Sequence, residues 1–365
     1  MVTVVRRTLH DKIFIIALIC AGLSLFIGTP QLTAINWATI GTLFALMISV
    51  QLLRAMHLLD TLRDWLLVKS HDTRQMCQLF IFGGSMILTN DVAILTLIPI
   101  FLTLARRQHL AIAYPATLII MAANLGSAFT PIGNPQNLFL VTFYHVNLFT
   151  FFKLSTPLML ASLALLVALS WRLPRLPLTV TPTKSTPISR SQIGLAGGLL
   201  SFIMLGIFNL VPISLVIIGT IVVGLMINRR VFQYVDYALL LTFICFFIFV
   251  SAISHNPAIT HWLNQLTQTA PSVYITGLIT SQVISNVPAA ILLANFTPHL
   301  SALFLGVNIG GLGSLVASLA NLLALKQLLP FNDEQPLHHF LIVFTALNGL
   351  GLFILGLGGW FYLHL

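Results

Sequence analysis

The stretch Asn124-Leu-Gly-Ser-Ala-Phe-Thr-Pro-Ile-Gly-Asn-Pro-Gln-Asn137 decides the fold of this 365-residue chain. It lies inside an apolar segment, residues 110–146, that would be about 55 Å long as one helix, whereas a membrane core is only about 30 Å thick. Pro131, Gly133 and Pro135 within the stretch are expected to break that helix near its centre. The sequence therefore predicts a broken transmembrane helix over about 110–146.

A related stretch lies in the second half of the chain, at residues 308–321. At an offset of 184 positions, it carries polar or small residues where the first stretch carries them. The matched pairs are Asn124 and Asn308, Gly126 and Gly310, Thr130 and Ser314, Asn134 and Ser318, and Asn137 and Asn321. Such matches at one spacing are hard to obtain by chance in an apolar background. The sequence therefore predicts a second broken helix over about 301–326.

Each broken helix is preceded by an apolar segment with a polar centre. The first segment, about 76–105, has the tip Thr89-Asn90-Asp91, and the second, about 272–299, has the tip Ser285-Asn286-Val287-Pro288. Each arm has about 14 residues and reaches about 21 Å, which is too short to cross the membrane. Lys and Arg flank only the first segment. We therefore predict two re-entrant helical hairpins that enter from opposite sides of the membrane.

The rest of the chain supplies surface helices and membrane spans. Amphipathic stretches at 57–68 and 259–266 precede the two hairpins and suit a membrane surface. Seven further stretches are apolar and long enough to be spans: about 13–29, 35–53, 148–171, 192–210, 212–228, 237–253 and 338–363. Lys and Arg gather on one side of this threading, which predicts about nine crossings with a cytoplasmic N-terminus and an external C-terminus. A cleaved signal peptide is the alternative for the first stretch.

We therefore expect an all-α polytopic protein of the plasma or inner membrane, built from two inverted repeats. Residues 1–172 form the first repeat, residues 192–365 form the second, and a cytoplasmic linker rich in Pro, Thr and Ser occupies 173–191. Only 7% of the residues are charged and 58% are hydrophobic, whereas globular domains carry roughly 25% charged residues. This composition excludes a soluble enzyme. The net charge of +9 is spread too thinly for nucleic-acid binding.

The hairpin tips and helix breaks predict a binding site halfway through the membrane, because non-helical backbone at that depth lines a cavity or is buried in protein. Inverted repeats with discontinuous helices are typical of secondary transporters. Ser85 and Thr89 are four positions apart, so their hydroxyls share a helix face below Asn90. Carbonyls near Gly133 would complete a cage of oxygens for a monovalent cation. The second half repeats this arrangement with Ser281, Ser285, Asn286 and the carbonyl of Ala317.

Asp91 is the only acidic residue that this threading places deep in the membrane. A charged carboxylate is costly there unless it is paired or hydrogen-bonded. Three roles remain open for it: a cap of the returning helix arm, a ligand of the coupled cation, or a proton carrier. A membrane-embedded enzyme is not expected, because neither a histidine nor an H-E-x-x-H motif is placed near the hairpin tips. A passive channel is a further alternative.

The tip and break motifs, above all Gly133-Asn134-Pro135 with the upstream Asn124, resemble those of the ion transporter superfamily, in particular the divalent anion:Na⁺ symporters and the citrate and arsenite permeases. The resemblance implies two sodium sites, one formed by Ser85, Thr89, Asn90 and Gly133 and the other by Ser281, Ile284, Asn286 and Ala317. It implies substrate contacts from Asn90, Asp91, Asn134, Pro135, Ser285, Asn286, Val287 and Ser318. It also implies a homodimer, an elevator-like movement of a transport domain, and no cofactor beyond Na⁺ or H⁺ as the coupling ion.

We therefore expect a secondary active transporter for a small anion, either a carboxylate or an inorganic oxyanion. Members of the resembled family carry Thr at the third tip position, where this chain has Asp91 and Val287. This difference weakens the case for a C4-dicarboxylate. Arsenite or antimonite efflux and Na⁺/H⁺ exchange, within the same superfamily, are the alternatives that Asp91 supports.

Overall fold

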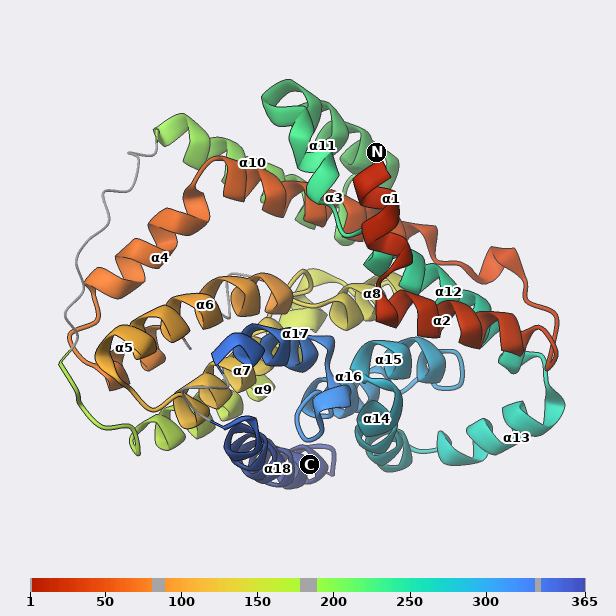
Figure 1. The fold of residues 1–365 in the computed structure, drawn as a ribbon. Helices are drawn as coiled ribbons and strands as arrows, with labels where there is room; N and C mark the ends of the chain where they lie inside the picture. Colours follow the sequence, from red (N-terminus) through yellow and green to blue (C-terminus); the bar gives the residue numbers. More distant parts are fainter. Residues whose placement is uncertain (1, 81–88, 178–188, 332–335, 365) are drawn as a thin grey trace.

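The computed structural model of the chain describes residues 2–80, 89–177, 189–331 and 336–364. All regular secondary structure in these ranges is helical (Figure 1). The α-helices of the first half are α1 Val2–Leu9, α2 Lys12–Ser24, α3 Trp37–Ala55, α4 Leu58–Val68, α5 Thr73–Leu79, α6 Asn90–Gln108, α7 Ala113–Ser127, α8 Pro135–Phe143 and α9 Leu148–Ser170. Those of the second half are α10 Arg190–Ile207, α11 Ile213–Asn228, α12 Tyr237–Ser254, α13 Pro257–Leu266, α14 Ala270–Ile284, α15 Asn286–Ala294, α16 Leu300–Ile309, α17 Leu319–Leu328 and α18 Leu337–Tyr362. Short 3₁₀ turns occur at Leu32–Ala34, Arg229–Tyr234, Leu315–Ala317 and Leu329–Phe331.

Six helices in the described residues are long and apolar enough to cross a membrane. They are α3, α9, α10, α11 with its 3₁₀ extension to Tyr234, α12 and α18, and each coincides with a predicted span. The chain is therefore a multi-pass membrane protein. The expected first span, 13–29, differs: α2 has only 13 residues, and a helix of that length reaches only about 20 Å. The helix ends before Gly28, so this stretch is shorter than a full crossing.

Both predicted broken helices are interrupted where the sequence indicates. The first runs from α7 through a non-helical break at 128–134 (the first break) into α8, and the second runs from α16 through 310–318 (the second break) into α17. Polar side chains start the helix after each break. Asn134 caps α8 by accepting the Asn137 backbone N–H at 2.9 Å, and Ser318 caps α17 by accepting the Ala320 N–H at 3.3 Å.

The two predicted hairpins differ in how much of them the structure describes. The second consists of α14 and α15, separated by Ser285 alone. The first includes α5 and α6, but residues 81–88, and with them Ser85, lie outside the described residues. The amphipathic stretches that precede the hairpins form α4 and α13, as predicted.

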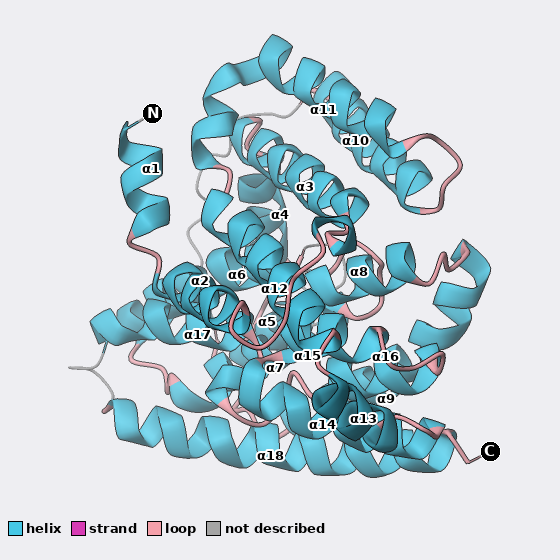
Figure 2. Ribbon diagram, turned by 90° about the vertical axis from the view of Figure 1, so that its right-hand side faces the viewer, coloured by secondary structure: helices cyan, strands magenta, loops and turns pink. Residues whose placement is uncertain are grey.

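The helices of the two halves pack across each other. Helix α6 contacts α17, and α15 contacts α8, so the arm after each hairpin tip packs on the helix that follows the break of the other half. Helices α3, α10 and α11 form a group at one edge of the molecule, and α18 lies at the opposite edge (Figures 1 and 2). The breaks therefore lie between these edges, within the main hydrophobic core.

Candidate functional site

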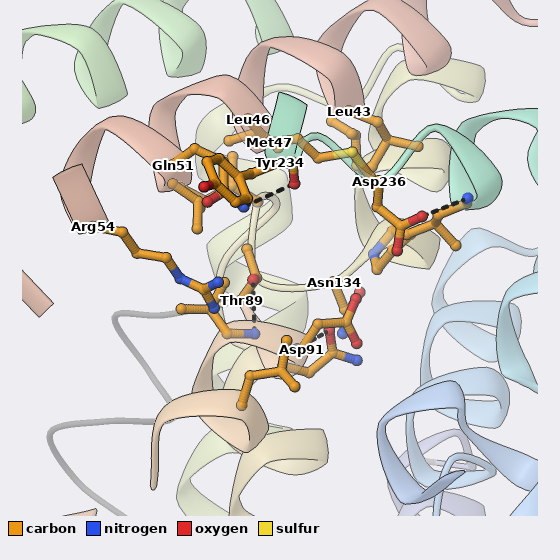
Figure 3. Close-up of a pocket in the computed structure, with 18 residues that line it drawn as sticks. Leu43, Leu46, Met47, Gln51, Arg54, Thr89, Asp91, Asn134, Tyr234 and Asp236 are labelled. Atoms are coloured by element: carbon orange, nitrogen blue, oxygen red, sulfur yellow. Dashed lines mark hydrogen bonds between the residues drawn. The ribbon is translucent and has the colours of Figure 1, made fainter. Parts of the chain in front are cut away.

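A cavity of about 190 Å³ lies against the first hairpin tip and the first break (Figure 3). We call it the tip cavity. Its polar and charged lining comes from Gln51, Arg54, Thr89, Asn90, Asp91, Asn134, Tyr234 and Asp236. Its apolar lining includes Pro135 and side chains of α3 such as Leu43, Leu46 and Met47. Five of the predicted substrate or cation residues, Thr89, Asn90, Asp91, Asn134 and Pro135, therefore share one cavity.

The first hairpin tip is hydrogen-bonded directly to the first break. The backbone N–H of Asn90 donates to the carbonyl of Gly133 at 2.9 Å. Thr89 has extended backbone and caps α6, and the Asn90 side-chain carbonyl accepts the backbone N–H of Asp91 at 2.9 Å. The Asn90 side chain is buried. The tip and Gly133 thus lie together, as the predicted oxygen cage requires.

Three charged side chains line the tip cavity. Asp91 is half-buried in the first turn of α6, where the helix macrodipole stabilises a carboxylate. Asp236 caps α12 by accepting the Leu239 N–H at 3.1 Å. Arg54 comes from the last turn of α3 and is also half-buried. In the view of Figure 3, Arg54 and Asp236 lie on opposite sides of the cavity, with Asp91 between them.

Four lining residues belong to no motif that predicts a site: Arg54, Asp236, Gln51 and Tyr234. Arg54 is one of the Lys and Arg residues whose distribution predicts the orientation in the membrane, and Asp236 belongs to no sequence motif. They line the cavity because α3 and the start of α12 pack beside the hairpin tip. No local sequence pattern predicts this packing. The one available signal was an Arg and an Asp at the ends of apolar spans.

The second hairpin tip is closed onto its own break. Ser285 has φ +77° and ψ 154°, a conformation that costs a non-glycine residue about 1–3 kcal/mol and is found at functional sites. Its hydroxyl donates to the carbonyl of Ala317 at 3.5 Å. Ser281 is fully buried, and its hydroxyl donates to the Gly277 carbonyl at 2.7 Å. Asn286 is buried as well. Ala317 is the counterpart of Gly133 at the 184-residue offset, so each tip contacts the matching carbonyl of its own break.

The remaining predicted residues of the second half lie around this tip. Val287 is buried on α15, and Ser318 is buried at the start of α17. Ile284, the last residue of α14, keeps 37% of its side chain exposed. None of the second-half predicted residues lines the tip cavity. The structure thus forms two clusters from the predicted residues rather than one shared cavity.

A glutamine fastens the second break to the second hairpin. The side-chain amide of Gln282 donates to the carbonyls of Gly310 and Leu312 at 2.7 and 2.9 Å, and its oxygen accepts the Ser314 N–H at 2.9 Å. These are backbone groups that the end of α16 leaves without helical partners. Gln282 therefore holds the break in place, a role that the sequence analysis did not foresee.

Six of the side chains that link the two halves around the breaks form what we call the break network: Asn124, Asn134, Asn137, Asn308, Ser318 and Asn321. Asn124 donates to Asn321 at 2.7 Å, and Asn308 donates to Asn137 at 2.8 Å. Ser318 donates to Asn124 at 2.8 Å, and Asn134 donates to Asn308 at 3.1 Å. All six side chains are buried. The four bonds form two pairs: replacing both residues of one bond by their counterparts at the 184-residue offset gives the other bond of the pair. Each of the four bonds joins the first half of the chain to the second half.

Comparison with known proteins places these features in a family. A sequence model described as citrate transporter matches residues 11–302. The chain is 32% identical over 333 residues to the inner membrane protein YbiR of Escherichia coli strain K12, which covers 88% of this chain and 89% of that protein. It is 31% identical over 295 residues to the uncharacterized transporter MJ0456 of Methanocaldococcus jannaschii, which covers 80% of this chain and 81% of that protein.

Proposed function

Because this chain belongs to the citrate transporter family, we propose that it is a secondary active transporter that carries a small anion, a carboxylate or an inorganic oxyanion, across the membrane. The observation that carries the proposal is the tip cavity. Predicted substrate residues of the hairpin tip and the break, among them Asn90 and Asn134, line it together. Non-helical backbone beside a polar cavity is the arrangement by which transporters of this architecture bind ions and substrates.

The transport cycle that we propose is alternating access by an elevator-type movement. The hairpins and broken helices form the moving part, and α3, α10 and α11 belong to the static part. Two inverted repeats, re-entrant hairpins and about nine crossings are part of this proposal. The break network supports the repeat, since its bonds occur in pairs related by one sequence offset. The tip cavity lies beside Arg54 and the 3₁₀ turn at 229–234, on the side that Lys and Arg mark as cytoplasmic, so we assign this conformation as inward-facing.

Coupling to Na⁺ or H⁺ belongs to the same proposal. Hydroxyl and carbonyl oxygens at Thr89, Asn90 and Gly133 form the described part of one cation site, with Ser85 as its fourth expected member. Ser281, Ile284, Asn286 and Ala317 form the other. The contact between each hairpin tip and the carbonyl of Gly133 or Ala317 supports these assignments. We also propose a homodimer, which mass measurement of the purified protein in detergent tests.

The direct test is uptake by proteoliposomes that contain the purified protein. Radiolabelled citrate, succinate, phosphate and arsenite are offered separately, with and without a Na⁺ gradient and with and without a pH gradient. We expect one of these substrates to accumulate against its gradient only when an ion gradient is imposed, with saturation and counterflow. Saturation and counterflow separate a transporter from a passive channel. If no anion accumulates while Na⁺ drives proton movement, the anion proposal is wrong.

Asp91 favours two further candidates within the same fold, arsenite or antimonite efflux and Na⁺/H⁺ exchange. Its carboxylate lines the tip cavity beside Asp236, so two acidic side chains face the same space. Such a pair suits a cation or proton pathway. The proteoliposome experiment distinguishes the candidates, because exchange predicts proton movement without any labelled anion.

A further inference from the structure

Arg54 is a positively charged side chain that the structure leaves facing a cavity. It is half-buried at the end of α3, and it lines the tip cavity with Asp91 and Asp236. Among the residues that the structure describes, no ion pair joins Arg54 to either of these carboxylates. A partly desolvated guanidinium without a counter-charge is unfavourable unless a ligand supplies one. The cavity therefore contains a cationic group that is available to a negatively charged ligand.

Two other polar side chains that line the cavity are already engaged. The Gln51 side-chain amide, one turn earlier on α3, donates to the Tyr234 carbonyl at 3.2 Å. Asn134 donates to Asn308 and caps α8. Within the described lining of the cavity, Arg54 is the only Lys or Arg side chain. Recognition of negative charge by a side chain in this cavity therefore depends on Arg54.

We propose that Arg54 is a specificity-determining residue, which binds the transported anion through its guanidinium and, together with the carboxylates of Asp91 and Asp236, restricts the substrate to a small anion of single negative charge. This inference rests on the anion transport proposed above. A guanidinium presents parallel N–H donors that match a carboxylate or an oxyanion. It neutralises one negative charge.

The two carboxylates supply the restriction on charge. With one guanidinium against Asp91 and Asp236, the ionised cavity is formally negative before any ligand enters. A monoanion pairs with Arg54, whereas the second charge of a dianion meets carboxylates without another positive side chain in the described lining. The volume of the cavity, about 190 Å³, is also smaller than the roughly 300–1,000 Å³ typical of sites for drug-sized ligands. Size and charge thus both favour a small monoanion.

The test measures equilibrium binding to the purified full-length chain in detergent, with probes that differ in charge but little in size. Lactate is compared with malonate, and nitrate with sulfate. In the wild type, we expect the monoanion of at least one pair to bind about tenfold more tightly than its dianion partner. Arg54→Gln should weaken monoanion binding by about tenfold, and Arg54→Lys should restore part of that loss.

Two further variants complete the design. Asp236→Asn removes one of the repelling carboxylates and should narrow the preference for the monoanion. Arg229→Gln is the matched control, because Arg229 is an exposed arginine on the same expected side of the membrane and does not line the tip cavity. It should leave binding unchanged. A thermal unfolding curve for each variant separates lost binding from lost folding, and Arg54→Lys keeps the test valid if Arg54→Gln does not fold.

The outcomes separate this inference from the proposed function. If anions bind but dianions bind more tightly in both pairs, or if Arg54→Gln binds them as the wild type does, the role of Arg54 is wrong while anion transport stands. If no anion binds, and none is taken up by proteoliposomes even when lactate and nitrate are offered, the proposed function fails and this inference fails with it.

Discussion

The first and second hairpins carry matching residues but differ in their surroundings. The first tip, with Asn90 and Asp91, faces a cavity that α3 and the start of α12 complete. The second tip contacts the carbonyl of Ala317, and Gln282 holds its break in place. Gly311 allows the second break to approach the amide of Asn286 so closely that a side chain there would collide with it. Related sequences thus produce one open and one closed site.

This difference agrees with the inward-facing end state that we propose for the transporter. Both tips contact their own breaks, but the first tip also lines the tip cavity, whereas none of the predicted residues of the second half does. The comparison also shows that the two sites are unequal in chemistry. At an offset of 196 positions, Gln282 aligns with Met86, which has no amide to hold a break, and Val287 takes the position of Asp91.

The largest expected effect comes from the two tip asparagines. Asn90→Ala and Asn286→Ala each remove an amide that is predicted to contact both cation and substrate, so each should abolish uptake by proteoliposomes. Insertion into the membrane, measured by the yield of folded protein, should change little. If only Asn90→Ala abolishes transport, the second hairpin is not a binding site, and the expected equivalence of the two tip asparagines is wrong.

A second effect comes from Gln282→Met, which gives the second half the residue found at the aligned position of the first. It removes three hydrogen bonds to the break and leaves the Ser314 N–H and two carbonyls without these partners. We expect the free energy of unfolding to fall by about 3 kcal/mol, since each buried unpaired group costs about 1–3 kcal/mol. Chemical denaturation in detergent measures this change.

Gln265→Met is the control for that substitution, because Gln265 is exposed on α13 and lies away from both breaks. Equal stability of the two variants would show that Gln282 does not hold the break.

Gly133→Ala tests the first break in the same way and should have a smaller effect. A Cβ at residue 133 would collide with the backbone of Ser127, whereas the matching residue of the second half, Ala317, already carries one. We expect a loss of about 1–3 kcal/mol on thermal unfolding, the usual cost of overpacking. Gly356→Ala, where the added methyl meets open space, should lose nothing. A stable Gly133→Ala protein would mean that the two breaks are interchangeable.

The subtlest test concerns Asp91, whose counterpart at the second tip is Val287. If Asp91 carries the coupling proton, Asp91→Asn should retain substrate binding but lose the acceleration of uptake by a pH gradient. Arg54 and Asp236 face Asp91 across the cavity and stay unchanged in this variant. Uptake is measured at several pH values inside and outside the vesicles. Undiminished pH-driven uptake by Asp91→Asn would eliminate the carrier role and leave the cap or cation-ligand role.

Much of the fold could be predicted from the sequence because apolar stretches and breaking residues act locally. The prolines and glycine of 131–135 and the caps Asn134 and Ser318 determine where helices end and begin, and the structure places them there. The 13–29 stretch was read as a full span because its composition is apolar, yet its helix ends at Ser24. Gly28 lies so close to the backbone of Ala252 that a side chain there would collide with it, and sequence composition does not reveal this contact.

The candidate site was predictable only in part, for a similar reason. Asn90, Asp91 and Asn134 belong to motifs that stand out from an apolar background, and they line one cavity. Arg54 and Asp236 belong to no motif, and their place in the cavity depends on packing between helices that are far apart in the chain. Gln282 was overlooked because a single polar residue in an apolar arm does not reveal which backbone groups it will meet. The hydrogen bonds between the two breaks could not be predicted, because the sequence shows only that polar residues match at an offset of 184 positions.

The break network has a consequence for the synthesis of the protein. Asn124, Asn134 and Asn137 leave the ribosome long before Asn308, Ser318 and Asn321 have been translated. Until then their side chains lack the hydrogen-bond partners that the second half supplies. The membrane insertion machinery must therefore keep the early half in a form that tolerates these polar groups, and the last helices to emerge complete the packing of the first ones.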